Sequence, residues 1–278
     1  MTTTLPAMGS TRRRSDVPLP VALVALVTII FFALPLAGLL WRAPWSNLRE
    51  LLTTRSSLDA LRLSLVCSLS SAAISTVAGI PLAWLLARVA FPGRSVVRAM
   101  TTLSMVLPPV VGGVALFLAF GRHGLMGQFL DRWFGLQLPF STAGVIVAET
   151  FVSMPFLIFT VEAAIRSADR APEEAARTLG GSRWYTFRRV TLPTVRPALV
   201  AGIVLAWARA LGEFGATITF AGNFPGRTQT LPLLVYLGME SNPQQAIALA
   251  LVLVAVSLIV LSAFRDRWLG ALRIPVGG

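Results

Sequence analysis

Two oppositely charged residues, Arg209 and Glu213, lie four positions apart within an apolar stretch at residues 198–221. An arginine at the centre of a membrane helix costs about 2.5–3.5 kcal/mol on insertion scales. Because residues four apart share one face of a helix, the two side chains can neutralise each other. The spacing predicts either an ion pair that holds helices together or a pair that lines or braces a path across a membrane. Glu149, in a second apolar stretch, has the same two interpretations.

A third apolar stretch, at residues 99–120, contains prolines and glycines that predict a break in its helix. Pro108 and Pro109 are followed by Gly112 and Gly113. Two prolines remove two backbone donors from a helix. Free backbone groups at membrane depth are tolerated only where protein buries them or where they line a cavity. The pattern predicts either a hinge or site on a path, as transporters use, or a fixed kink.

The chain lacks the residue sets of common catalytic and metal sites. His123 is the single histidine and Cys67 the single cysteine, so neither an HExxH motif nor an internal disulfide can form. All 24 basic residues are arginine. A Walker A site needs a lysine, so any ATP must be bound by another subunit. We expect this chain to hold no metal or cofactor and to be no enzyme.

The composition indicates an integral membrane protein, because 55% of residues are hydrophobic and 13% are charged, against about 25% charged in soluble domains. A helix needs about 20 residues to cross the bilayer core. The apolar stretches of sufficient length are residues 18–41, 61–89, 99–120, 142–165, 198–221 and 244–264. The sequence therefore predicts an all-α protein with six transmembrane helices in a lipid bilayer.

The arginines are distributed unevenly between the predicted loops. If the N-terminus is cytoplasmic, sixteen arginines fall inside, seven fall outside, and Arg209 lies within a span. Because cytoplasmic loops carry the excess of basic residues, both termini are predicted to be cytoplasmic. The net charge of +12 then reflects topology, and we expect no nucleic-acid partner. The predicted divisions are a tail (1–17), a first helix with an external linker (18–60), a core (61–264) containing a cytoplasmic loop (166–197), and a second tail (265–278).

The loop at 166–197 has the signals of a helical hairpin. Pro172 followed by Glu173 and Glu174 suits the first turn of a helix, because proline fits there and acids favour the positive end of the helix dipole. The Gly180-Gly181 pair can end that helix, and Ser182 can cap a second one. The loop is therefore predicted to be two short helices.

The second of these helices is predicted to present one apolar face, from Trp184, Phe187 and Val190. An unpartnered apolar face is typical of a site for another protein. Alternatively, the face packs on the chain's own helices or meets anionic lipid headgroups.

The spacing within this loop resembles type I ABC importer permeases, whose cytoplasmic loop has the pattern EAA-x3-G-x9-I-x-LP. The match covers 20 positions, with valine in place of isoleucine. The matching residues are Glu174, Ala175, Ala176, Gly180, Val190, Leu192 and Pro193. The resemblance implies the type I importer permease fold, with these residues forming coupling helices that sit in a groove of a separate ATPase subunit.

A second stretch, residues 210–236, is similar to the molybdate branch of the sulfate/molybdate permeases. It has the sequence ALGEFGATITFAGNFPGRTQTLPLLVY. Sulfate permeases share the GEFG and AGN-x-PG elements but diverge around TITF and RTQTLPL. The resemblance implies the transmembrane subunit of an ATP-driven molybdate importer. A sulfate or tungstate importer is the alternative. An ion-gradient-driven secondary transporter would use the intramembrane charges, but the coupling motif argues against it.

The resemblance also implies partners and a location. These are a second permease copy forming a homodimer, an ABC ATPase dimer that binds ATP, and an extracytoplasmic molybdate-binding protein, in the cytoplasmic membrane of a prokaryote. Outer-loop residues Asn223 and Arg227 are expected contacts for the binding protein. Pro108, Pro109, Glu149, Arg209 and Glu213 are the expected pathway or bracing residues.

Overall fold

The computed structural model describes residues 18–271, and every regular element in that range is helical. The chain divides after Ala43 into two units. In the first unit, α1 (Leu19–Trp41) has 23 residues, none of which is buried. A helix of this length and composition suits a bilayer core about 30 Å thick. The predicted tail at 1–17 and the part of the second tail after Ala271 lie outside the described residues.

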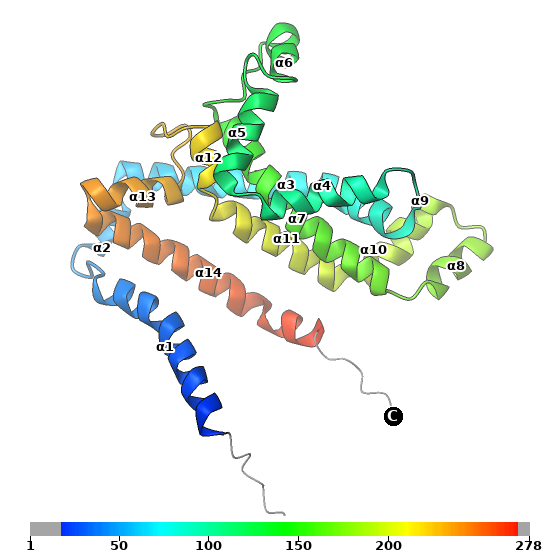
Figure 1. Ribbon diagram of the computed structural model, residues 1–278, viewed down its shortest axis with the longest axis horizontal. Helices are drawn as coiled ribbons and strands as arrows, with labels where there is room; N and C mark the ends of the chain where they lie inside the picture. Colours follow the sequence, from blue (N-terminus) through cyan, green and yellow to red (C-terminus); the bar gives the residue numbers. More distant parts are fainter. Residues whose placement is uncertain (1–17, 272–278) are drawn as a thin grey trace, which may run out of the picture. The chain divides into compact units, whose positions relative to one another are not determined.

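Three helices form the centre of the second unit, and they are α3 (Arg55–Arg88), α7 (Thr142–Ser167) and α11 (Arg196–Leu211), which lie side by side (Figure 1). Leu86, Leu157 and Ala206, one from each helix, are buried in a common core. A Cβ atom added to Gly79 would lie 3.0 Å from Leu157 Cδ2. Small residues at such crossings let membrane helices approach closely.

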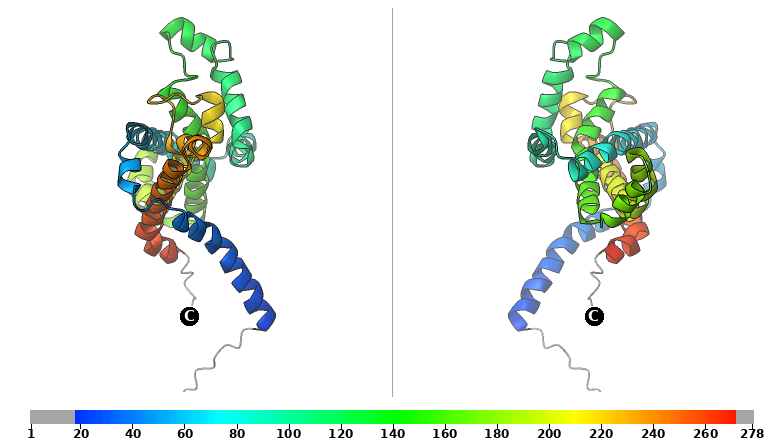
Figure 2. Two further views of the ribbon diagram at one scale, coloured as in Figure 1. Left: turned by 90° about the vertical axis from the view of Figure 1, so that its left-hand side faces the viewer. Right: turned by 90° about the vertical axis from the view of Figure 1, so that its right-hand side faces the viewer.

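The other helices surround this centre. They are α2 (Leu48–Leu52), α4 (Arg94–Val106), α5 (Pro109–Phe120), α6 (Gly127–Phe134), α8 (Ala171–Thr178), α9 (Arg183–Thr186), the π-helix η1 (Phe187–Thr191), α10 (Leu192–Thr194), α12 (Gly215–Phe220), α13 (Leu231–Ser241) and α14 (Pro243–Ala271). Helices α8 and α9 lie at one end of the bundle, and α2 and α13 lie at the other (Figure 1). In both views of Figure 2, α6 lies beyond the far end of α5.

Four predicted spans are single helices of membrane-spanning length: α1, α3, α7 and the first part of α14. The third predicted span is broken between Val106 and Pro109, which confirms the predicted interruption at the two prolines. A continuous helix over residues 198–221 is wrong, because α11 ends at Leu211 and α12 begins at Gly215. Six crossings, with both termini on the cytoplasmic side, remain a prediction.

Candidate functional site

A helical hairpin at one end of the bundle contains the motif that resembles the importer loop. It runs from α8 to α10, and we call residues 171–194 the hairpin module. Helix α8 ends where Gly180 adopts φ 86°. The Gly180 N–H donates to Arg177 O at 3.0 Å, and the Gly181 N–H donates to Ala176 O at 2.9 Å. This pair of bonds satisfies the last carbonyls of the helix, so the predicted helix end is confirmed.

The second half of the module begins as predicted and then departs from a regular helix. Ser182 Oγ accepts a hydrogen bond from the Tyr185 N–H at 3.1 Å and so caps α9. The chain then forms η1, and the Leu192 N–H donates to Phe187 O, five residues back. The module turns by 78° into α11.

The predicted apolar face of the second helix is divided between two environments. Phe187 is buried and packs edge-on against Trp84 of α3, with ring centroids 5.5 Å apart. Trp184 contacts the Phe187 ring but stays 67% exposed, and Val190 is half-buried. One predicted face is therefore partly an internal contact and partly an open surface.

Most of the motif lies on the exposed side of the module. Glu174 and Gly180 are exposed, and Leu179 between them is 88% exposed. Tyr185 extends this surface. Of the remaining motif residues, Ala175 and Pro193 are exposed, and Ala176 and Leu192 are half-buried. A module that exposes a carboxylate and large apolar side chains is suited to bind another protein.

Glu173, next to the motif, is the residue that joins the module to the bundle. Arg88, the last residue of α3, places Nε 3.2 Å from Glu173 Oε2 and Nη2 3.2 Å from Oε1. The hydroxyl of Thr191 donates to Oε1 at 2.9 Å. The sequence assigned Glu173 only to the helix dipole. A contact between residues 85 positions apart leaves no local pattern by which it could be predicted.

The charged pair predicted in the fifth apolar stretch is present and interrupts the helix. Arg209 Nη1 lies 2.7 Å from Glu213 Oε2, and Glu213 is 1% exposed. Glu213 Oε1 also accepts a hydrogen bond from the Ala216 N–H at 2.8 Å. The carboxylate therefore serves the end of α11 and the first turn of α12 together, which explains why the expected continuous helix is divided.

The two interrupted stretches meet at their breaks. A Cβ added to Gly215, the first residue of α12, would lie 2.9 Å from Pro109 Cβ, at the start of α5. A Cβ added to Gly113 would collide with Thr219 Oγ1 and lie 2.8 Å from Ala216 O. The structure thus brings Pro108 and Pro109 to the α12 segment that Glu213 caps. The close packing there depends on glycine.

Glu149 lies on α7, and it is 1% exposed. Its Oε2 atom has no hydrogen-bond partner among the described residues. Ala148, the preceding residue, packs with Ala216 of α12. The described residues include no group of three His, Cys, Asp or Glu side chains able to hold a metal ion. Glu149 is therefore a buried acid close to the paired breaks.

Three serines of α3 connect this helix to its neighbours. Ser64 Oγ accepts from the Leu231 N–H at 2.7 Å, at the start of α13. Ser68 Oγ accepts from Trp207 Nε1 of α11 at 3.1 Å. Ser71 and Ser153 of α7 share a hydrogen bond at 3.1 Å. This polar stripe is used for packing between helices.

The comparisons with known proteins decide the family. Residues 79–272 match the model of the binding-protein-dependent transport system inner membrane component. The chain belongs to this family of permeases. The Mycobacterium tuberculosis molybdenum transport system permease protein ModB is 45% identical over 265 residues, which cover 95% of this permease and 97% of the relative. Escherichia coli ModB is 40% identical, covering 76% and 92%. The sulfate transport system permease protein CysT of Escherichia coli is 35% identical, covering 87% and 86%.

Solved structures support the fold of the permease. A chain of a bacterial ABC transporter that imports the polysaccharide alginate has a TM-score of 0.68 at 21% identity, with 89% of this permease and 94% of that chain covered. A chain of the MetNI methionine ABC transporter in an inward-facing conformation has a TM-score of 0.59 at 21% identity, covering 78% and 96%. At this identity the likeness establishes the fold only. The permease therefore has the fold of ABC importer permeases.

The loop between α12 and α13 of the permease holds Asn223 and Arg227. Arg227 is exposed, and its carbonyl accepts from Thr142 Oγ1 at 2.9 Å. Asn223 is half-buried, and its Oδ1 has no partner among the described residues. Phe140 and Phe224 pack edge to face with ring centroids 6.1 Å apart. The loop is tied to the start of α7, whereas the hairpin module follows the end of α7.

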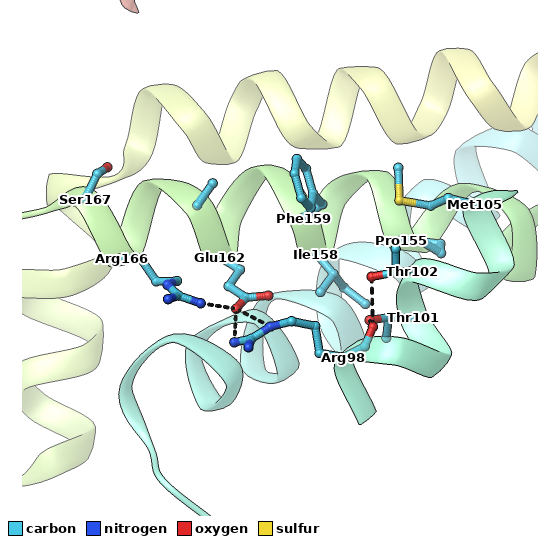
Figure 3. A pocket seen from close by; sticks show the side chains of 11 residues that line it. Arg98, Thr101, Thr102, Met105, Pro155, Ile158, Phe159, Glu162, Arg166 and Ser167 are labelled. Atoms are coloured by element: carbon cyan, nitrogen blue, oxygen red, sulfur yellow. Dashed lines mark hydrogen bonds and ion pairs between the residues drawn. The ribbon is translucent and has the colours of Figure 1, made fainter. Parts of the chain in front are cut away.

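An ion-pair cluster that sequence reasoning missed joins α4 and α7 of the permease. Arg98 Nε lies 3.0 Å from Glu162 Oε1, and Arg166 Nη1 lies 3.5 Å from the same oxygen (Figure 3). A cavity of about 460 Å³ beside the cluster is lined by side chains of both helices. Arg98 Nη2 also donates to Leu86 O at 3.1 Å. The cluster therefore fixes the start of α4 against α7 and the last turn of α3.

A further ion pair lies at α6, outside the bundle. Gln137 Nε2 donates to Asp131 Oδ1 at 2.9 Å, and Arg122 Nε donates to Oδ2 at 3.0 Å. These two hydrogen bonds lower the pKa of Asp131 below its usual value. Because the pKa of Asp131 is lowered in the folded state, these contacts stabilise the folded loop at pH values above the usual pKa of aspartate. Their contribution is lost as the pH falls through the folded pKa.

Proposed function

We propose that this permease is the transmembrane subunit of an ATP-driven importer of molybdate. The observation that carries the proposal is the 45% identity to ModB of Mycobacterium tuberculosis over 95% of the chain. Relatives named as sulfate permeases are 34–35% identical. The stretch at 210–236 adds support, because it is similar to the molybdate branch of these permeases. It forms the helix break before α12 and lies within the matched family region.

The proposed topology has six crossings of the cytoplasmic membrane of a prokaryote, with both termini in the cytoplasm. In this arrangement α4 and α5 together form one crossing, and α11 and α12 form another. The support is the distribution of arginines, seven of which lie between Arg166 and Arg196. The hairpin module then lies in the cytoplasm, within the proposed loop 166–197 of the core 61–264.

We assign the exposed side of the hairpin module to an ABC ATPase dimer, which binds ATP. Glu174, which is exposed as Leu179 and Gly180 are, supplies a carboxylate for a basic group of the partner. The exposed apolar side chains supply area that contact with the ATPase removes from water. The capped ends of α8 and α9 make the module a defined shape. ATP-driven closure of the partner would then displace the module as a body.

The remaining residues are assigned to the path and to the outside. Pro108, Pro109, Glu149, Arg209 and Glu213 brace the paired breaks of α5 and α12, next to a path formed with a second copy of the permease. Asn223 and Arg227, in the loop after α12, contact an extracytoplasmic binding protein that delivers the oxyanion. We assign Arg209 a structural role rather than a role in guiding the anion, because Glu213 Oε2 lies 2.7 Å from its Nη1 and neutralises its charge.

A secondary transporter driven by an ion gradient is the second candidate. The observation that favours it is the buried Glu149, whose Oε2 has no hydrogen-bond partner among the described residues. Buried acids within membrane spans often take part in proton or ion pathways. Transport by the permease in liposomes without any ATPase would support this candidate.

Uptake in cells tests the substrate. Cells lacking the permease are expected to lose high-affinity accumulation of labelled molybdate and to regain it when the chain is supplied. Sulfate in excess is expected to compete poorly. If sulfate blocks molybdate uptake as well as unlabelled molybdate does, the permease is a general oxyanion importer. Competition by tungstate in the same cells measures how well the permease distinguishes molybdate from tungstate.

Accessibility of single cysteines tests the topology. A Cys67→Ala background with one cysteine at Leu179 or at Gly226 is expected to react with a membrane-impermeant thiol reagent from opposite sides of the membrane. Labelling of both positions from the same side would contradict the proposed number of crossings.

A further inference from the structure

We propose that Glu173, Arg88 and Thr191 form a clasp through which the hairpin module moves helix α3 during transport. The proposal rests on the proposed function, and it assigns a transmission role to residues outside the ATPase-facing surface. Glu173 is a positioning residue in this account, because it acts through α3.

The clasp is a buried and nearly closed set of contacts. The side chains of Arg88 and Glu173 are 6% and 12% exposed, and Thr191 is 2% exposed. Arg88 approaches both carboxylate oxygens of Glu173, and its Nη2 also donates to Ala168 O at 3.4 Å. Forked arginine–carboxylate contacts are short, directional and stronger than neutral hydrogen bonds. One carboxylate therefore fixes the end of α3.

The same carboxylate joins the two halves of the module. Glu173 lies in the first turn of α8, and Thr191 ends η1 on the other side of the hairpin turn. Thr191 Oγ1 donates to Glu173 Oε1 at 2.9 Å. Glu173 therefore links both halves of the module to Arg88 of α3, and a displacement of either half can reach α3 through this carboxylate.

Few contacts compete with the clasp in linking the module to α3. Among the described residues, the module also meets α3 where Phe187 packs on Trp84. A cavity of about 170 Å³ lies between the end of α3 and the module, and Trp84, Arg88 and Arg183 are among the side chains that line it. The module is thus attached to α3 by discrete side-chain contacts beside a void, and loss of one contact is not compensated by continuous packing.

Helix α3 can pass a displacement on to the spans. It is 34 residues long and packs along α7 and α11. Ser64, Ser68 and Ser71 connect it to α13, α11 and α7 at distances of 2.7, 3.1 and 3.1 Å. A movement at Arg88 therefore reaches three other helices through a continuous set of contacts.

Two adjacent glutamates separate transmission from partner binding. Glu173 is buried toward α3, whereas Glu174 is exposed on the other side of α8. Neighbouring residues of a helix point about 100° apart, so they do not share partners. The clasp predicts that neutralising each acid impairs a different step.

The test uses the permease reconstituted in liposomes with its ATPase and binding protein. A Glu173→Gln variant is expected to co-purify with the ATPase at the wild-type ratio and to hydrolyse ATP. We expect it to transport about tenfold less molybdate per ATP, within the usual range of coupling between sites. A Glu174→Gln variant is expected to lose ATPase co-purification instead. A control variant, Arg122→Gln, breaks the exposed ion pair at α6 and is expected to match wild type in both measurements.

Two milder variants keep the test decisive if Glu173→Gln folds poorly. Arg88→Lys keeps the charge but loses the forked geometry, and Thr191→Val removes only the hydroxyl. Each is expected to lower molybdate transported per ATP by a few-fold, as loss of single hydrogen bonds does. Wild-type transport per ATP in all three clasp variants overturns the clasp. A change in protein yield alone, with that ratio unchanged, also overturns it. If the wild-type complex moves no molybdate, the proposed function fails instead.

Discussion

At the scale of single residues, the buried carboxylate of Glu213 shows how strongly a charged side chain depends on its partners. Glu213 is 1% exposed and receives Arg209 and the Ala216 N–H. Taking one partner from a buried ion pair costs about 3–5 kcal/mol, because an unpaired charge remains. Removing both charges costs much less, since no charge is then left in the apolar interior. The pair is therefore stabilising only as a unit.

A double-mutant comparison tests this at the residue scale. Arg209→Met is expected to lower the unfolding temperature of the detergent-purified permease markedly, because the buried carboxyl group of Glu213 then lacks its partner. The double variant Arg209→Met/Glu213→Gln is expected to recover most of the loss, since glutamine still accepts from the Ala216 N–H. Tryptophan fluorescence on heating measures both. Equal losses in the single and double variants would contradict a mutual dependence.

The sequence predicted the residues of this pair but not their full environment. The four-residue spacing of Arg209 and Glu213 is a local rule, and the contact is found at 2.7 Å. The bond from Glu213 to Ala216 required a break in the helix, which the continuous apolar pattern concealed. Glu173 was missed for a related reason, because Arg88 lies far from it in the chain and meets it only in the folded bundle.

At the scale of elements, local signals predicted the ends of helices and tertiary packing decided the rest. Gly180 and Ser182 end and begin helices where the sequence placed them. The sequence predicts that Phe187 belongs to an apolar face that either binds another protein or packs on the chain's own helices, and Phe187 packs on Trp84 of α3. The break at Pro108 and Pro109 was predicted from missing donors, whereas its pairing with the α12 break depends on contacts between distant segments.

A substitution at Gly180 tests the backbone requirement of the module. Gly180 has φ 86°, and no atom lies within 4 Å of an added Cβ, so Gly180→Ala acts through backbone strain. That strain costs about 1–2 kcal/mol, and we expect weaker co-purification of the ATPase. Gly180→Asn is expected to lose less, because asparagine tolerates this conformation.

The matched control for this prediction is Gly93→Ala. Gly93 has φ 82° with equally open surroundings, and it precedes α4 outside the module. The variant carries the same strain but is expected to leave ATPase co-purification unchanged. Equal effects of Gly93→Ala and Gly180→Ala would show that the module's shape is not what the partner requires.

Gly113→Ala tests the pairing of the two breaks. The added Cβ would collide with Thr219 Oγ1 and approach Ala216 O at 2.8 Å, which forces α5 away from α12. Overpacking of this kind costs about 1–3 kcal/mol, and we expect reduced molybdate uptake with normal membrane insertion. The control is Gly38→Ala on α1, where the added Cβ has no atom within 4 Å. This variant is expected to change neither molybdate uptake nor membrane insertion. Normal uptake in Gly113→Ala would mean that the close approach is dispensable.

At the scale of the whole molecule, the apolar pattern predicted the helical membrane class, and similarity along the chain supplied the family. Four predicted spans are single helices, while two others are broken at positions that meet in space. The hairpin module at one end is fixed to α3, and α3 is fixed to three other helices. This arrangement accounts for how an event at the module can change the distant breaks.

The most direct test of the account is ATP-dependent accumulation of labelled molybdate in liposomes that contain the permease, its ATPase and its binding protein. The account predicts accumulation only when all three proteins and ATP are present. Accumulation by the permease alone under an ion gradient, or ATP-dependent accumulation of sulfate but not of molybdate, would contradict it.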